Sequence, residues 1–377
     1  MQHLLNKVMI ISLPILMLGF LMPDEKCSPG GKKKLIEQND GPYVLYKEGQ
    51  ILIKYIARDK NGKMIQADSM PVSQKDNITL YVATDEPDKK FTVKLKNDIR
   101  AENAEYPDVK KFFAISDIEG NFSAFRKLLQ ANAVIDADYN WTFGDGHLVL
   151  TGDFVDRGEQ VTEVLWLIYS LEEKAKAAGG YVHFILGNHE IMNLSGDLRY
   201  LNKKYIENVT LLNEKFETLF GENSEIGKWL RSKNIVENVG GVLFTHGGIS
   251  SEVNRLPLSI NEINTRSRPF YADTSYDYPS PIDTIFYETG PFWYRGYYVG
   301  SRKASPQQID STLQKFSVRN ISTGHTVVAD TISIWYNGKI LNTDVHHARG
   351  KSEGLLMEEG KFYRVNAEGR KTWLMDR

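Results

Sequence analysis

Hydrophobic and polar positions follow two different patterns along the chain. Between about Tyr43 and Lys96, apolar residues tend to recur at every second position, which is typical of half-buried β-strands. Turn-forming residues separate these runs, notably at residues 59–62 and 85–88. The apolar positions are Tyr43, Leu45, Ile51, Ile53, Tyr55, Ile78, Leu80, Val82, Phe91, Val93 and Leu95. The pattern predicts a small antiparallel β-rich region.

Beyond Pro107, short apolar runs alternate with amphipathic segments. The runs predict strands at residues 112–115, 148–151, 182–186, 242–245 and 321–323. The amphipathic segments predict helices at residues 122–130, 163–178, about 201–220 and 226–232, and the C-terminal part predicts hairpins that turn at 337–339 and 358–361. Strands that alternate with helices indicate a mixed α/β fold with a mostly parallel or mixed core sheet. We expect one sheet to pack on another, with helices outside.

The first residues differ from the rest. The segment from Val8 to Met22 is almost continuously apolar and follows Lys7, which is typical of a signal peptide or a short membrane anchor. Its length favours export, although no small-x-small cleavage site follows. Three lysines at 32–34 favour a cytoplasmic body if the segment stays in the membrane. We therefore expect an exported, periplasmic or membrane-anchored protein.

The composition of the chain limits the kinds of partner and metal site that it can have. The 46 basic and 48 acidic residues give a formal charge of -2, so the chain lacks the broad basic field that binds nucleic acid. The single cysteine, Cys27, excludes an intramolecular disulfide framework and a thiolate metal cluster. A metal site in this chain must use oxygen and imidazole ligands.

Polar side chains with catalytic or metal-binding chemistry follow directly after five of the predicted strands. In chain order they are Asp117 and Glu119, then Asp153, Asp156 and Arg157, then Asn188, His189 and Glu190, then His246, and finally His325. The carboxyl ends of the strands in an α/β sheet are where loops converge on a binding site. Each cluster alone could be a helix cap or a turn. Together they supply the ligands of a site for hard or borderline divalent metals.

The ordered motifs DxEG, GDxxDRG, GNHE, HGG and GHT resemble those of the calcineurin-like metallophosphoesterases, in the phosphoprotein phosphatase branch. The run from Gly290 to Arg295 is similar to that of the bacterial Shewanella-like protein phosphatases. The similarity covers about residues 112–328. It implies a β-sandwich flanked by helices as a catalytic domain at 109–377. A β-rich accessory region at 32–108 and a leader with linker at 1–31 would precede it.

The resemblance also implies the role of each residue. Asp117 and Glu119 would hold a first metal, Asp153 would bridge both metals, and Asn188, His246 and His325 would hold the second. His189 would protonate the leaving group while Asp156 fixes its tautomer, and Arg157 with Arg295 would bind the phosphoryl oxygens.

The family normally has histidine where this chain has Glu119, and a carboxylate is a harder ligand. We therefore expect Mn or Fe rather than Zn, with Mg a further option. The alternative is that Glu119 misses the metal and leaves the first site weak.

The function that follows is a dinuclear metal-dependent phosphatase. Attack by metal-bound hydroxide would hydrolyse phosphomonoesters, with phosphorylated Ser, Thr or Tyr side chains of proteins, or a small phosphate ester, as substrate and no nucleic-acid partner. Two alternatives stay open: a nucleotide or dinucleoside polyphosphate hydrolase, and a non-catalytic binding module with a decayed metal site.

Asp344, His346 and His347 are predicted to lie in a solvated turn rather than to approach the metals. Tyrosines at 271, 276, 278 and 287 form either a packed excursion or a substrate rim.

Overall fold

The computed structural model describes residues 37–300 and 303–377. The chain divides into two compact units, Met1–Leu35 and Ile36–Arg377, and the described residues all belong to the second. The predicted leader at 1–31 therefore lies outside the described residues. A search of the described part for helices that could cross a membrane finds none.

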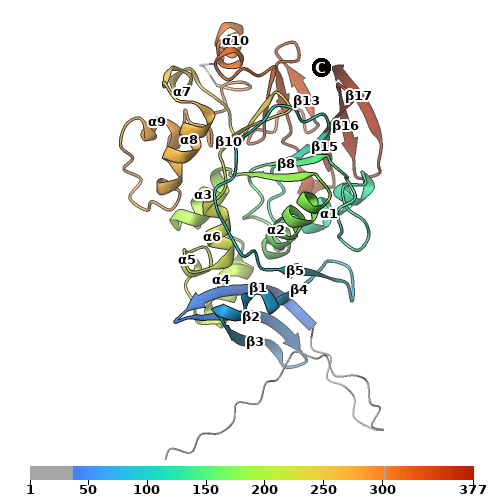
Figure 1. The fold of residues 1–377 in the computed structure, drawn as a ribbon, viewed down its shortest axis with the longest axis vertical. Helices are drawn as coiled ribbons and strands as arrows, with labels where there is room; N and C mark the ends of the chain where they lie inside the picture. The colour runs from blue at the N-terminus through green and yellow to red at the C-terminus, as the bar shows by residue number, and fades with distance from the viewer. Residues whose placement is uncertain (1–36, 301–302) are drawn as a thin grey trace, which may run out of the picture. The chain divides into compact units, whose positions relative to one another are not determined.

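Two six-stranded sheets form the centre of the fold (Figure 1). The strands of the first are β7 (Phe112–Ile115), β8 (His147–Thr151), β9 (Tyr181–Ile185), β15 (Glu353–Glu358), β16 (Lys361–Asn366) and β17 (Lys371–Asp376). Those of the second are β6 (Glu105–Tyr106), β10 (Val236–Val239), β11 (Val242–Thr245), β12 (Asn320–Thr323), β13 (Ser333–Trp335) and β14 (Ile340–Asn342). Their orders are β17-β16-β15-β7-β8-β9 and β13-β14-β12-β11-β10-β6. Strands β7, β8 and β9 are mutually parallel, as are β11, β12 and β14.

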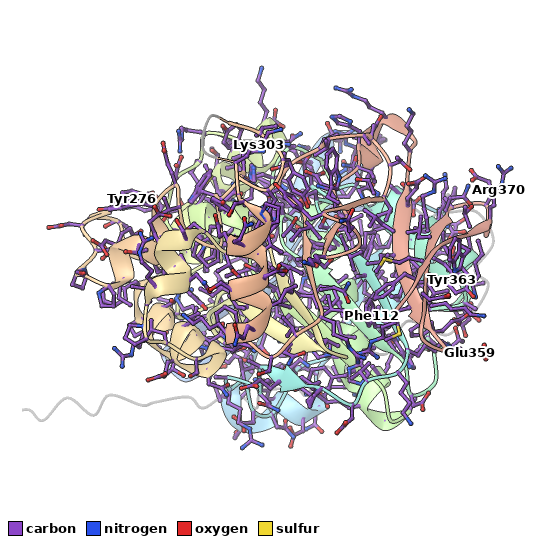
Figure 2. All side chains as sticks on the ribbon, turned by 90° about the horizontal axis from the view of Figure 1, so that it is seen from above. Phe112, Tyr276, Lys303, Glu359, Tyr363 and Arg370 are labelled. Atoms are coloured by element: carbon purple, nitrogen blue, oxygen red, sulfur yellow. The ribbon has the colours of Figure 1, made fainter. Side chains whose placement is uncertain are left out.

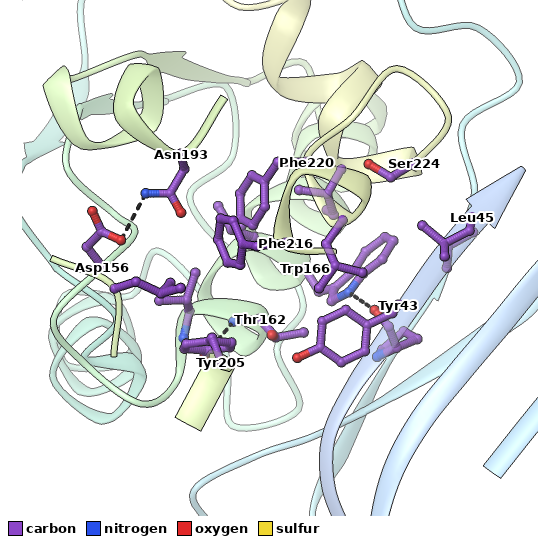
Figure 3. A pocket seen from close by; sticks show the side chains of 17 residues that line it. Tyr43, Leu45, Asp156, Thr162, Trp166, Asn193, Tyr205, Phe216, Phe220 and Ser224 are labelled. Atoms are coloured by element: carbon purple, nitrogen blue, oxygen red, sulfur yellow. Dashed lines mark hydrogen bonds between the residues drawn. The ribbon is translucent and has the colours of Figure 1, made fainter. Parts of the chain in front are cut away.

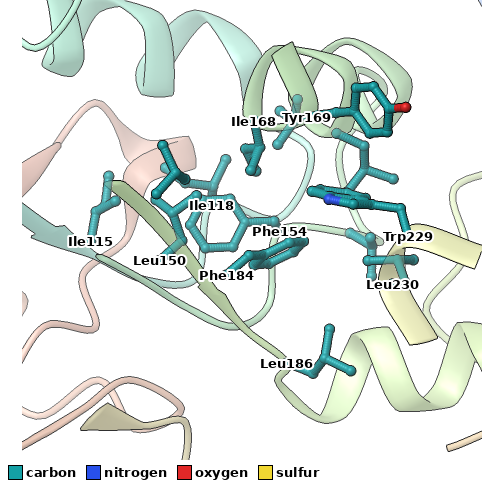
Figure 4. Packing of buried hydrophobic residues seen from close by; sticks show 14 of the residues in the cluster. Ile115, Ile118, Leu150, Phe154, Ile168, Tyr169, Phe184, Leu186, Trp229 and Leu230 are labelled. Atoms are coloured by element: carbon teal, nitrogen blue, oxygen red, sulfur yellow. The ribbon is translucent and has the colours of Figure 1, made fainter. Parts of the chain in front are cut away.

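The central strands are buried on both faces, which explains their uninterrupted apolar sequences. Phe112 of β7 faces the second sheet, where its ring centroid lies 5.3 Å from that of Phe244. Its neighbours Phe113 and Ile115 belong instead to the outer cluster with helix α2 (Val161–Ala177). Figure 4 shows this outer layer, in which Phe154 packs between the strands and α2. The predicted arrangement of packed sheets with helices outside is confirmed.

The remaining helices and short turns lie mainly around the sheets. They are α1 (Phe122–Ala131), α3 (Asn188–Ser195), α4 (Lys203–Leu212), α5 (Phe216–Leu219), α6 (Glu225–Arg231), α7 (Ser251–Arg255), α8 (Ile260–Ser267), α9 (Ile282–Phe286), α10 (Pro306–Lys315), and the 3-10 turns η1 (Val72–Asn77), η2 (Arg268–Phe270) and η3 (His347–Arg349). The segment predicted to be helical at 201–220 is divided by Asn213, which adopts a left-handed conformation and ends α4.

The N-terminal β-rich region consists of β1 (Glu37–Lys47), β2 (Gln50–Asp59) and β3 (Gly62–Pro71), with a second pair, β4 (Thr79–Ala83) and β5 (Lys90–Lys94). All pairings within it are antiparallel, as predicted. Strand β3 escaped prediction because it is an edge strand with mostly exposed residues, so its sequence shows no alternation. The region packs against α2 and α6, where Trp166 Nε1 donates to Pro42 O at 2.8 Å.

Candidate active site

The loops after the sheet strands converge on one open cleft of about 510 Å³. Eight of the ten residues that the sequence singles out as catalytic or metal-binding line it: Asp117, Glu119, Asp153, Arg157, Asn188, His189, Arg295 and His325. The other two, His246 and Asp156, are buried directly behind the lining and bond to members of it. The structure thus brings together side chains that lie more than 200 positions apart in the chain.

The backbone of this site is unusual. Asp117, Glu119, Asp153 and His325 have positive φ angles of 53°, 49°, 60° and 64°. Non-glycine residues rarely adopt this left-handed conformation, and it costs free energy that the surrounding structure must supply. Gly187 lets two loops approach closely, since a Cβ there would lie 2.3 Å from Asp153 Oδ1. The carboxylates are therefore held in place by a specialised backbone.

Three side chains form a compact group of potential metal ligands. One ligand atom from each of Asp153, His246 and His325 lies within 4.8 Å of the others. His246 Nε2 lies 3.1 Å from Asp153 Oδ2 and 3.0 Å from Asn188 Oδ1. The Nε2 atom of His325 is buried and has no hydrogen-bond partner among the described residues. A buried nitrogen without a partner is unfavourable, so this donor set fits a divalent cation.

The carboxylates of the cleft carry more negative charge than their neighbours balance. Burial, with the charges of Asp117 and Asp153, raises the pKa of Glu119 to about 7 despite Arg157. Burial also raises the pKa of Asp117 to about 6. Burial alone would raise the pKa of Asp153, but the imidazoles of His246 and His189 hold it well below its usual range. Cations bound in the cleft would relieve this repulsion.

His189 lies at the edge of this group and has a different set of partners. Its Nδ1 lies 2.7 Å from Asp156 Oδ2, and Asn193 Nδ2 donates to Asp156 Oδ1 at 2.9 Å. Burial lowers the pKa of His189, but the carboxylates of Asp153 and Asp156 outweigh it and raise the pKa to about 9. The ring packs against Tyr200, with centroids 4.9 Å apart. This arrangement holds a protonated imidazole at the cleft surface.

Two arginines lie on the cleft wall. Arg157 pairs with Glu119, and its side chain is 51% exposed. Arg295 Nη1 donates to His325 O at 2.5 Å and to Thr326 Oγ1 at 3.1 Å. Planar guanidinium groups in these positions suit the oxygens of a phosphoryl group.

The motif residue Glu190 binds the backbone of two loops that carry site residues. It is fully buried, and its carboxylate accepts hydrogen bonds from the backbone N–H groups of Gly187, Asp153, Phe154 and Val155 at 2.8–3.3 Å. It thereby joins the start of α3 to the Asp153 loop. The sequence placed Glu190 in a motif but gave it no role.

The prediction that Asp344, His346 and His347 lie in a solvated turn is wrong, because all three line the cleft and two of them are buried. Asp344 and His347 are only 5% and 3% exposed, and both line the cleft. His346 is half-buried, and its Nδ1 lies 2.9 Å from Asp330 Oδ1. Asp344 follows β14, which was predicted as one arm of a hairpin, but the parallel pairing of β14 with β12 that brings Asp344 to the cleft was not predicted.

Two of the four tyrosines of the aromatic loop are packed, whereas Tyr276 and Tyr287 are exposed. Tyr271 and Tyr278 are buried, and Tyr278 stacks on Phe286 at 4.4 Å. Tyr276 is 45% exposed and lies at the edge of the molecule, across from Tyr363 (Figure 2). None of the four predicted rim tyrosines lines the cleft; the aromatic residues that do are Tyr200 and Trp293.

A separate small cavity lies behind Asp156 (Figure 3). Its volume is about 40 Å³, and its walls come from β1, α2 and the helices at 203–231. Trp166 and Tyr43 line it together with Asn193, the residue that holds Asp156. The cavity is too small for a substrate, so it marks where the N-terminal strands pack beneath the active site.

Comparisons with known proteins show the family of the chain and several similar proteins. A family model described as calcineurin-like phosphoesterase matches residues 110–329. The chain is 28% identical over 234 residues to Shewanella-like protein phosphatase 1 of Plasmodium berghei, covering 59% of this chain and 63% of that protein. It is 30% identical over 245 residues to an uncharacterized protein of Schizosaccharomyces pombe, covering 63% of this chain and 73% of that protein. The crystal structure of a cold-active protein-tyrosine phosphatase of a psychrophilic Shewanella species superposes with a TM-score of 0.79 at 36% identity, covering 89% of this chain and 99% of that chain.

Proposed function

Because the chain belongs to the calcineurin-like phosphoesterase family, and is therefore a metal-dependent phosphoric ester hydrolase, we propose that it is a dinuclear phosphomonoesterase acting on phosphorylated proteins. The observation that carries the proposal is the grouping of Asp153, His246 and His325 at the floor of an open cleft.

Six residues supply the ligands. Asp117 and Glu119 hold a first cation, Asp153 lies between two sites, and Asn188, His246 and His325 hold the second. The short distances from His246 to Asp153 and Asn188, and the unpartnered Nε2 of His325, support this division. Two divalent cations bound there lower the pKa of a water molecule and neutralise charge on the phosphoryl group.

The other residues bind the phosphate group and move a proton. Arg157 and Arg295 bind the phosphoryl oxygens and orient the ester. His189 donates its proton to the leaving oxygen, and Asp156 accepts from its Nδ1–H so that Nε2 carries the transferred proton. The contact of Nδ1 with Asp156 supports this role, because this carboxylate favours the protonated imidazole.

Two features favour a protein side chain as substrate. The cleft is open and broad, and its aromatic wall residues Tyr200 and Trp293 can contact a flat group next to the phosphate. The relatives include proteins named protein phosphatase and protein-tyrosine phosphatase. The same aromatic residues could contact a nucleotide base, and the relatives include symmetrical bis(5'-nucleosyl)-tetraphosphatases, so a nucleotide or dinucleoside polyphosphate is the alternative substrate.

Activity assays with purified full-length protein and Mn²⁺ or Fe²⁺ test the proposal. Turnover of phosphopeptides should exceed turnover of nucleotides and dinucleoside polyphosphates. His189→Ala should lower turnover about a hundredfold or more and leave the metal content unchanged, as expected for loss of a proton donor. Preferred turnover of nucleotides would support the polyphosphate hydrolase, and no turnover with any metal would support the non-catalytic binding module.

A further inference from the structure

The end of a sixth strand, β14, lies next to the loops that carry Asp117 and His325. Strand β14 runs parallel to β12 with Asn342 opposite Thr323, so both strands end at the same edge of the sheet. Thr343 follows β14, and its Oγ1 lies 3.0 Å from Thr323 O and 3.0 Å from Ser116 Oγ. These contacts tie the next residue, Asp344, to the loops that carry Asp117 and His325.

The carboxylate of Asp344 has no protein partner. Asp344 is about nineteen-twentieths buried and lines the cleft, yet it accepts no hydrogen bond from the part of the chain that the structure describes. The neighbouring carboxylates differ from it, since Asp117 accepts from His325 N at 3.1 Å and Asp153 accepts from His189 N at 3.0 Å. A buried carboxylate without a donor is costly unless a cation faces it.

The protein's own cations at the cleft are directed elsewhere. Arg157 pairs with Glu119, and Arg295 donates to His325 O and Thr326. Arg349 is exposed and forms no ion pair with Asp344 in the part of the chain that the structure describes. Asp344 is repelled by the carboxylates of Asp117, Glu119 and Asp153, and the single imidazole of His246 does not offset them. The group that would balance Asp344 is therefore a bound cation.

We propose that Asp344 is an additional oxygen ligand of the first metal, beside Asp117 and Glu119. The inference rests on the proposed dinuclear function. Asp344 would add a fourth carboxylate to a first site that already uses Asp117, Glu119 and Asp153, whereas the second site would keep two imidazoles. Oxygen ligands alone favour Mn²⁺ or Mg²⁺ over Zn²⁺, so Asp344 and Glu119 together set the metal preference of this site.

Calorimetric titration of chelator-treated, full-length protein with Mn²⁺ tests the inference. Wild type should bind two ions, and Asp344→Asn should weaken one of them about tenfold or more while leaving the other unchanged. Asp344→Glu should recover part of the lost affinity. His325→Ala should weaken the other site, which separates the two. Asp310→Asn is the matched control, because Asp310 is exposed on α10 and does not line the cleft.

Thermal unfolding of the metal-free proteins separates a ligand from a structural residue. Removing an unbalanced buried charge should leave metal-free Asp344→Asn at least as heat-stable as wild type. A metal-free variant that unfolds at a lower temperature, or one that binds two Mn²⁺ with wild-type affinity, would overturn the role of Asp344 alone. Wild type that binds fewer than two Mn²⁺ would overturn the proposed function and this inference together.

Discussion

His189 and Asp156 form a buried pair, with Nδ1 and Oδ2 2.7 Å apart, at the surface of a cleft built from carboxylates and imidazoles. The second oxygen of Asp156 accepts from Asn193 Nδ2, so the carboxylate cannot turn away from the imidazole without losing a hydrogen bond. The pair holds the ring in the orientation that a proton donor requires.

Asp156→Asn should lower turnover about a hundredfold to ten-thousandfold, because an amide can hold the imidazole in the wrong tautomer. Steady-state kinetics with p-nitrophenyl phosphate measures the effect, and metal content should stay at the wild-type value. The matched control is Asp138→Asn, the same exchange at an exposed carboxylate that does not line the cleft, and it should keep activity. Wild-type turnover in Asp156→Asn would show that Asp156 does not act through His189.

Gly187→Ala should disturb the metal site through steric contact. The added Cβ would lie 2.3 Å from Asp153 Oδ1 and 2.7 Å from Asp153 N, so this carboxylate must move. Misplacement by about an ångström should lower turnover about a hundredfold. Elemental analysis of the purified variant should also show less bound metal.

Gly360→Ala is a control variant in which the added Cβ strains the backbone but touches no neighbouring atom. Gly360 has φ of 72° with no atom within 4 Å of the added Cβ, so this variant should lose about 1 kcal/mol of stability and no activity. Equal metal content and turnover in Gly187→Ala and wild type would contradict the packing of the Asp153 loop on Gly187.

Glu225→Ala should destabilise the docking of the N-terminal strands. Glu225 is fully buried and accepts hydrogen bonds from the hydroxyls of Tyr46 and Tyr169, each at 2.5 Å. Losing this shared acceptor should cost about 3 kcal/mol, measured by urea unfolding. Turnover per folded molecule should stay near wild type, because Glu225 does not line the cleft.

Glu222→Ala changes an exposed glutamate close in sequence and should alter stability by less than about 0.5 kcal/mol. If both variants unfold at the same urea concentration, the buried hydrogen bonds of Glu225 do not hold the N-terminal strands in place.

Glu102 gives a pH dependence remote from the metal ligands. Burial raises its pKa, but Lys233 and Lys176 outweigh this and lower the pKa to about 2. A carboxyl group with a lower pKa in the folded state stabilises the fold above about pH 4.5, and this stabilisation disappears as the pH falls towards 2. Lowering the pH from 5 to 3 should therefore reduce the free energy of unfolding of wild type by about 1–2 kcal/mol more than that of Glu102→Gln. If the free energies of unfolding of the two proteins change in parallel with pH, Glu102 is not ionised more readily in the folded protein.

The sequence predicted the sheet strands and the cleft residues because both depend on local patterns. Strands such as β7 are apolar throughout, and polar motifs follow them immediately. The resemblance to calcineurin-like and Shewanella-like phosphatases, read from those motifs, is confirmed by the comparisons.

Other features depend on tertiary contacts and left no such pattern. The strand before Asp344 was predicted as one arm of a hairpin, but its pairing with β12, which brings Asp344 to the cleft, left no pattern in the sequence. Strand β3 has no apolar alternation because it is an edge strand. The motif at Asn188 also forms the first turn of helix α3, although its residues were interpreted as a loop. Packing against distant parts of the chain decided each of these.

The central claim is that two cations bind in this cleft, and anomalous diffraction from crystals grown with Mn²⁺ tests it most directly. The account predicts two peaks: one within bonding distance of Asp117 and Glu119, one within bonding distance of Asn188, His246 and His325, and Asp153 in contact with both. A single peak, or peaks away from these residues, would contradict it.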